Sequence, residues 1–183
     1  MTKLVSLICA IAALSACHQI GPVSYFYQSP PDESSLTELT QLPTSGTAHY
    51  DGRIGVGFKQ TETISDARLV GDLGLTADFR LDEVNGYADN FEDRLTGEHL
   101  GGTLAVASSF DRRTDLDRFY GLSGTAVGTL RDRANGPVIV DLDLDGDFFG
   151  RSGSSIAGDL RGTVSGLPLT PEVKVTGVFE VEY

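Results

Sequence analysis

From residue 46 onward, apolar and polar residues alternate along the chain, and this alternation constrains the fold more than any other feature. A period of two is the pattern of a β-strand with one buried face. Between 137 and 149, for example, Val138, Val140 and Leu142 alternate with Asp141 and Asp143. Eight segments carry the pattern, although 84–91 leaves open which residues face inward: 47–58, 69–81, 84–91, 100–110, 119–130, 137–149, 154–164 and 172–183.

Short turn signals separate most of these segments, and Asn135-Gly136 is the strongest because both residue types tolerate a positive φ. Successive strands with short connections predict an antiparallel up-and-down order, and eight such strands close readily into a barrel. Several of the 22 glycines fall on the apolar stripes, where a small and strongly curved barrel has little room for side chains. We therefore predict an all-β, eight-stranded antiparallel barrel over residues 46–183.

The first 17 residues form a separate unit. Lys3 precedes the apolar run Leu4–Ala13, which is too short to span a bilayer and is typical of a secretory signal peptide. The run ends in Leu14–Cys17 (LSAC), which resembles the bacterial lipobox, whose cysteine is acylated after cleavage. We predict a lipoprotein signal peptide over 1–16, lipidation at Cys17 and a lipid-anchored tether over 17–45. An ordinary secretory signal that contains a cysteine is the alternative.

The lipid anchor also predicts a location. Two or three acyl chains hold a protein stably at a membrane, whereas one chain binds only marginally. His18 follows the lipidated cysteine, and by resemblance to enterobacterial sorting a residue other than aspartate there implies the outer membrane. Lipid would block Cys17, and Cys9 would leave with the signal peptide. We therefore expect neither a disulfide nor a thiolate metal site in the mature protein.

The net charge of −12 restricts the possible ligands and indicates which face of the strands points into the barrel. It excludes nucleic acid as a ligand, because phosphate binding needs clustered lysine and arginine. An outer-membrane barrel, apolar outside, is an alternative that alternation alone does not exclude. However, the chain has no tryptophan, and Asp141, Asp143, Asp145 and Asp147 would crowd a narrow lumen. We expect a soluble, monomeric barrel with its apolar stripes inside.

Three stretches resemble the barrels of the transferrin-binding protein B family. LDLDGDFFGRSGSSIAGDLRG (142–162) is similar to that family's strand-turn-strand motif, although Asp159 or Ser155 stands near the usual glutamate. LPTSGTAHYDGRIGVGF (42–58) and LGLTADFRLDEVNGYADNF (73–91) are similar to its opening and following segments. The residues that match the first motif are Gly146, Phe148, Phe149, Gly150, Ile156, Ala157 and Gly158.

This resemblance implies a lipid-anchored eight-stranded barrel at the outer membrane that binds a protein or haem, as family members bind transferrin, complement factor H or haemoglobin. The C-terminal barrel of factor H binding protein shares the pattern. The two-lobed receptors also carry handle domains, which a single-barrel chain lacks, so transferrin binding itself is not implied. Most predicted connections are short and leave little room for a large binding cap.

Asp141–Gly146 (DLDLDG) matches the first half of an EF-hand calcium loop. The twelfth position is Ser152 rather than the bidentate glutamate that such a loop needs, and Leu142 and Leu144 continue a strand stripe. We expect an acidic outer strand face rather than a calcium site.

A haem or zinc site would need His49 and His99 to converge with a further ligand. Tyr50, Tyr87 and Tyr120 are candidates for lining a haem cleft, although core or rim aromatic residues are the more common case. We expect no resident metal or cofactor.

The sequence contains none of the common catalytic motifs of hydrolases, zinc proteases, redox dithiols or P-loop proteins. Arg112-Arg113, Arg118, Arg131 and Arg133 lie in or beside turns, where they form charge pairs or mark a partner contact. We predict a non-catalytic binding module for a protein or an iron- or haem-containing ligand. A lipocalin-like carrier of a small apolar ligand and a structural envelope lipoprotein are the alternatives.

Overall fold

The computed structural model describes residues 36–58, 60–112, 120–132, 136–167 and 170–183. Every segment with period-two alternation is a strand, which confirms the all-β prediction. The elements in chain order are η2 (Leu39–Gln41), β1 (Thr47–Gly57), η3 (Ile64–Asp66), β2 (Leu69–Asp78), β3 (Glu83–Asp93), β4 (Glu98–Arg112), β5 (Tyr120–Asp132), β6 (Gly136–Phe149), β7 (Ser155–Leu167) and β8 (Thr170–Glu182), where η marks a 3-10 turn.

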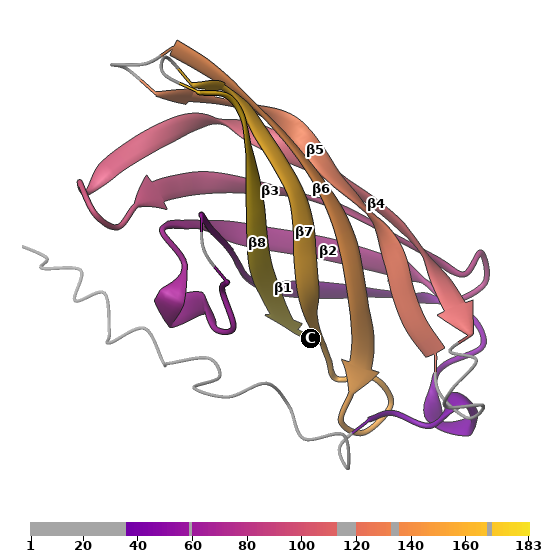
Figure 1. Cartoon of the computed structure of the whole chain (residues 1–183). Helices are drawn as coiled ribbons and strands as arrows, with labels where there is room; N and C mark the ends of the chain where they lie inside the picture. The colour runs from indigo at the N-terminus through magenta and orange to yellow at the C-terminus, as the bar shows by residue number, and fades with distance from the viewer. Residues whose placement is uncertain (1–35, 59, 113–119, 133–135, 168–169) are drawn as a thin grey trace, which may run out of the picture.

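The eight strands form one closed barrel in sequence order. Each strand pairs antiparallel with the next, and β1 closes the sheet by pairing with β8 from Asp51 opposite Glu182 to Gly57 opposite Thr176. Figure 1 shows the strands tilted and curved around the shared interior. Full closure removes both sheet edges, so no strand among these eight is left as an edge strand.

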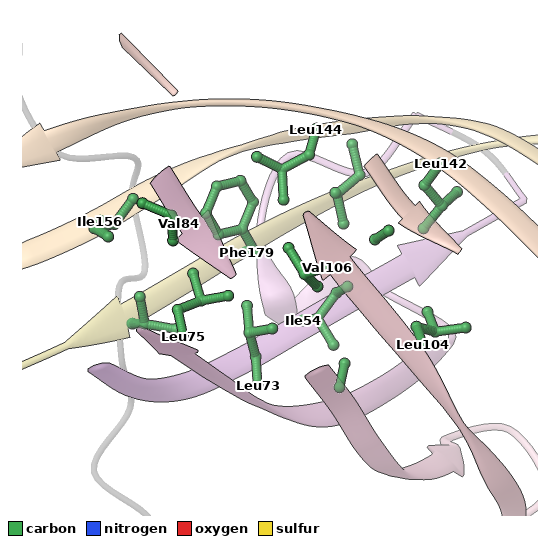
Figure 2. Close-up of a cluster of buried hydrophobic side chains, with 14 of the residues drawn as sticks. Ile54, Leu73, Leu75, Val84, Leu104, Val106, Leu142, Leu144, Ile156 and Phe179 are labelled. Carbon is green, nitrogen blue, oxygen red and sulfur yellow. The ribbon is translucent and has the colours of Figure 1, made fainter. Parts of the chain in front are cut away.

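The apolar stripes face inward, as the sequence predicts. Side chains from strands far apart in the chain meet in the interior, where Ile54, Leu104, Leu142 and Phe179 belong to one buried cluster (Figure 2). Asp141, Asp143 and Asp145 lie exposed on the outer wall between these buried positions. The barrel is therefore apolar inside and acidic outside over β6.

A β-bulge in β3 explains why the 84–91 segment is ambiguous in the sequence. Val84 and Ala88 are buried at even positions, but Phe91 and Asp93 are buried at odd positions. The β3–β4 register shifts between Ala88 and Phe91, and Asn90 has φ 52°. One extra residue at a bulge moves all later side chains to the other face.

Glycines relieve crowding between neighbouring strands of this narrow barrel. A Cβ atom on Gly158 of β7 would overlap the carbonyl oxygen of Asp145 on β6. A Cβ atom on Gly177 of β8 would likewise overlap the carbonyl oxygen of Gly55 on β1. These inward-facing positions therefore need glycine for space rather than for an unusual φ.

The chain that precedes β1 packs against one end of the barrel. The backbone N–H of Thr37 donates to the Phe148 carbonyl oxygen at 2.8 Å, and its hydroxyl donates to the Gly150 carbonyl oxygen at 2.7 Å. Leu42 is buried in the same cluster as the barrel interior, and its side chain lies against Gly153. Residues 36–45, the described part of the predicted tether, therefore cover this end.

Candidate functional site

A groove lies on the outer wall of the barrel and has a volume of about 720 Å³. We call it the outer groove. Its floor is the outer face of β6, β7 and β8, and one wall is Gln60–Ile64 from the connection between β1 and β2. The volume falls within the range of roughly 300–1,000 Å³ that is typical of small-molecule sites. A second cavity, of about 440 Å³, lies at the barrel end between the chain preceding β1 and Phe79 and Phe110.

The β1–β2 connection forms a wall because it folds back onto the outside of the barrel. Ile64, Ala67 and Val70 make a small buried cluster that packs against Val178 of β8. Gly55 provides the space, because a Cβ atom there would lie 2.6 Å from the Cβ atom of Ala67. This cluster gives the outer wall a local apolar core that is separate from the barrel interior.

Hydrogen bonds fix the connection at both sides of the groove. The backbone N–H of Thr61 donates to Oγ1 of Thr176 on β8 at 3.0 Å. From the β3–β4 turn, Arg94 donates to the carbonyl oxygens of Ile64 and Ser65 at 3.1 and 3.0 Å. The wall of the groove is thus attached to β8 on one side and to the β3–β4 turn on the other.

An ion pair secures the end of the same connection. Arg68 donates from Nε and Nη2 to Oδ2 of Asp93 at 3.0 and 2.8 Å, and its guanidinium lies 5.1 Å from the ring centroid of Phe58. Burial raises the pKa of Asp93, but hydrogen bonds from Arg68 and from the backbone N–H groups of Leu95 and Thr96 outweigh it, so the pKa lies below its usual value. The carboxylate therefore stays ionised and holds the connection at neutral pH.

Cross-strand pairing places carboxylates side by side on the floor of the outer groove. Asp159 of β7 lies directly opposite Asp145 of β6, and Ala157 lies opposite both Asp147 of β6 and Glu180 of β8. Like charges in directly opposed positions repel each other. The floor is therefore an acidic surface with a small apolar residue at its centre.

Glu180 is the exceptional residue of the groove. Only 7% of it is exposed, and its Oε1 atom is buried without a hydrogen-bond partner among the described residues. Burial, together with the negative charge of Glu182, raises the pKa of this carboxyl from 4.5 to about 7, although Arg53 across the β1–β8 pairing acts in the opposite direction. A side chain in this state can take up a proton or accept a cation near neutral pH.

The alternation of β8 places Glu180 on the outer face, where sequence reasoning expects an exposed residue. The β1–β2 connection lies beside it, because Gln60–Ile64 line the same groove as Glu180. The only signal in the sequence is the loss of alternation between residues 58 and 68. This signal marks a long connection but does not show where it folds.

The histidines and tyrosines considered for haem or zinc do not converge. His49 is exposed near the start of β1 and shares a hydrogen bond of 2.9 Å with Thr76, whereas exposed His99 follows the turn at the opposite end of the barrel. Tyr50 is buried and donates to the Gly153 carbonyl oxygen at 2.8 Å, whereas Tyr87 is exposed on the outer wall. The side chain of Tyr120 lies outside the described part of the structure.

Asp141–Gly146 is a stretch of extended strand rather than a loop. Leu142 and Leu144 are buried while Asp141, Asp143 and Asp145 are exposed, so the motif is an acidic strand face as expected. Within the described ranges, no group of three or more histidine, cysteine, aspartate or glutamate side chains could hold a metal ion.

The remaining candidates fall largely outside the described residues. Arg131 is exposed at the end of β5. Cys17, Arg113, Arg118 and Arg133 lie outside the described ranges, as does the side chain of Arg112.

In the part of the chain that the structure describes, no helix is long and apolar enough to cross a membrane. Comparison with models of known protein families and with curated protein sequences gives no match for this chain.

Proposed function

We propose that the protein is a non-catalytic binding module whose ligand binds in the outer groove rather than inside the barrel. The observation that carries this proposal is the contrast between the two surfaces. Buried leucine, isoleucine, valine and phenylalanine side chains pack together in the interior (Figure 2), whereas the outer groove is open and holds a buried carboxyl group whose Oε1 atom has no hydrogen-bond partner among the described residues. Sites with a few unsatisfied polar groups in a concave surface are typical binding sites.

The proposal includes the location expected from the sequence. Lipidation at Cys17 would hold the barrel at the outer membrane, and residues 18–35 would connect the lipid to the chain that packs on the barrel end. The resemblance to the transferrin-binding protein B family supports a protein or an iron- or haem-containing ligand. The closed eight-stranded barrel is consistent with that resemblance.

A lipocalin-like carrier is the second candidate, since its fold is also an eight-stranded barrel. Such a carrier needs an interior cavity, whereas one cavity described above lies on the outer wall and the other at the barrel end, where Leu42 and Phe79 of the interior cluster line it. The filled interior therefore favours the outer groove. A structural envelope lipoprotein without a ligand is the third candidate, and it offers no reason for a buried carboxyl oxygen that lacks a hydrogen-bond partner within the described part of the chain.

Protease treatment of whole and lysed cells tests the location. A surface protein is digested in whole cells, whereas digestion only after lysis would contradict surface display. A Cys17→Ala variant is expected to leave the membrane fraction.

Ligand capture tests the groove with a matched pair of variants. Asp159→Arg puts a cation into the outer groove, and Asp141→Arg makes the same change on exposed β6 outside it. Protein purified from cells is exposed to host or environmental fluid and, separately, titrated with haemin by absorbance. We expect Asp159→Arg to reduce capture at least tenfold and Asp141→Arg to leave it within about twofold. Equal capture by both variants would exclude the outer groove as the site.

A further inference from the structure

The outer groove carries an imbalance of charge. Arg161 is the only cationic side chain among its lining residues within the described chain. Against it stand three carboxyl groups, from Glu62, Asp159 and Glu180. A concave surface with this imbalance concentrates the field of its carboxylates and attracts cations. Acidity alone does not define a site, however, so a second observation is needed.

That second observation is the Oε1 atom of Glu180. The atom is buried, the residue that carries it lines the groove, and no donor among the described residues reaches it. A buried acceptor without a partner costs free energy, and an ionised carboxylate costs more. A donor that enters the groove with a positive charge would satisfy the atom and offset its burial. The groove is therefore incomplete without a cationic donor.

The shape and polarity of the surroundings narrow the class of cation. Ala157, Val178 and Ile64 line the groove near Glu180 and present small or apolar surfaces. Such surfaces can pack against the methylene groups of an aliphatic chain. A single carboxyl oxygen without a partner among the described residues matches a compact ammonium group better than a guanidinium group, which binds two oxygens at once. The described residues do not form a metal cluster, which favours an organic cation over a metal ion.

We propose that the outer groove binds an alkylammonium group, with its methylene stem on Ala157 and Val178 and its charge on the carboxylate of Glu180. This inference rests on the proposed function, because it names the chemistry that the groove recognises. The ammonium belongs either to a free aliphatic amine or to a lysine side chain of a protein ligand. Both sources present the same group to Glu180, and the experiment below separates them.

Binding of this kind depends on pH through the ionisation of Glu180. The charged groups that act on it are Glu182 on β8 and Arg53, which lies opposite it on β1. Asp159 of β7, Asp147 of β6 and Glu62 of the β1–β2 connection line the same groove. With a pKa of about 7, the ionised fraction rises from about a tenth at pH 6 to about nine-tenths at pH 8. We therefore expect affinity for an ammonium to rise about tenfold over this interval.

Calorimetric titration of the full-length protein, purified in detergent, tests the inference with three probes. Cadaverine represents a free amine, N-acetyl-lysine methylamide represents a lysine side chain, and N-acetyl-norleucine methylamide is the uncharged match for the lysine probe. We expect at least one ammonium probe to bind at pH 8 and the norleucine probe not to bind. Preference for cadaverine indicates a small-amine ligand, and preference for the lysine probe indicates a protein ligand.

Two variants assign the effect to one carboxyl group. Glu180→Gln keeps the size of the side chain and removes its charge, and Glu172→Gln makes the same change at an exposed position on β8 outside the groove. We expect Glu180→Gln to weaken ammonium binding at least tenfold at pH 8 and to abolish its dependence on pH. Glu172→Gln is expected to change affinity by less than about twofold.

A measurement on the unsubstituted protein tests the inference even if the Glu180→Gln variant does not fold. In protein labelled with ¹³C-glutamate, saturating ammonium probe should lower the pKa read from the δ-carbon shift of Glu180, because a bound cation favours the carboxylate. Absence of ammonium binding at pH 8, equal binding of the norleucine probe, or an unchanged pKa of Glu180 would each overturn the inference. If Asp159→Arg loses ligand capture but the unsubstituted protein binds no ammonium probe, this inference alone is refuted. If Asp159→Arg captures ligand as well as the unsubstituted protein does, the proposed function is refuted.

Discussion

Replacement of Glu180 by glutamine should change how the stability of the barrel depends on pH. In the folded protein, burial raises the pKa of this carboxyl from 4.5 to about 7. A raised pKa means that ionising this carboxyl costs more free energy in the folded protein than in the unfolded chain. Its contribution to stability is therefore full below pH 4.5 and is lost as the pH rises through about 7.

The magnitude follows from the size of the shift. A change in pKa from 4.5 to about 7 corresponds to roughly 3 kcal/mol at one carboxyl. The outer groove opens to solvent, and screening reduces this figure, so we expect about 2 kcal/mol. Most of the loss should occur between pH 5 and pH 8, where the unfolded chain is already ionised while the folded carboxyl still titrates.

The assay is equilibrium unfolding in urea, followed by circular dichroism, at several values between pH 5 and pH 8. Glu180→Gln cannot ionise, so its free energy of unfolding should exceed that of the unsubstituted protein increasingly as the pH rises. Comparing two proteins at each pH removes the effect of the other carboxylates. Glu180→Met, which has a similar length and no amide, is a second variant in case the glutamine amide lacks an acceptor.

The control is Glu172→Gln on exposed β8, which should track the unsubstituted protein at every pH. The reasoning is refuted if the gap between Glu180→Gln and the unsubstituted protein is constant with pH. It is equally refuted if the gap narrows as the pH rises, because the carboxyl of Glu180 would then be stabilised in its ionised form.

Three further predictions concern the elements that position the groove and close the barrel. Asp93→Asn should cost about 1–2 kcal/mol at pH 7, because it removes the ion pair with Arg68. The cost should shrink as the pH falls below the usual carboxyl pKa of 3.8 and through the lowered pKa of folded Asp93, and urea unfolding at about pH 7 and pH 3 measures this. Thr37→Val should cost about 1 kcal/mol by removing a buried hydroxyl that donates to Gly150, measured by the thermal unfolding midpoint. Gly158→Ala should destabilise the barrel by about 2–3 kcal/mol or prevent folding, because its Cβ atom would overlap a backbone carbonyl oxygen. Gly101→Ala is the control, since no atom lies within 4 Å of the added Cβ atom, and it should cost less than about 0.5 kcal/mol when both variants are unfolded in urea.

Each of these has a result that would contradict it. A cost of Asp93→Asn that is equal at pH 7 and pH 3 would show that the ion pair contributes nothing through its charge. An unchanged midpoint in Thr37→Val would show that the chain preceding β1 does not stabilise the barrel. Equal stability of the two glycine variants would contradict the argument that inter-strand spacing, rather than backbone entropy, requires glycine on the inward stripes.

The period-two alternation by itself determined the class of fold, the positions of the strands and, outside 84–91, which residues of each strand share the apolar face. That this face lies inside the barrel was expected from the absence of tryptophan and from the row of aspartates in 141–147. These properties are local, since every second side chain of a strand points to the same side whatever the strand pairs with. The acidic face of Asp141–Gly146 follows from the same rule. The alternation did not resolve 84–91, because the bulge at Asn90 depends on pairing with β4.

Only the tertiary structure decided where a ligand could bind. The outer groove joins the β1–β2 connection to β6, β7 and β8, which lie about a hundred residues away along the chain. The packing of Ile64 and Ala67 over Gly55 determines where the connection folds. Glu180, which strand alternation places on the outer face, is buried in the groove that this connection helps to line. Burial depends on what covers a residue, and alternation along one strand carries no information about a segment that packs on it from elsewhere in the chain.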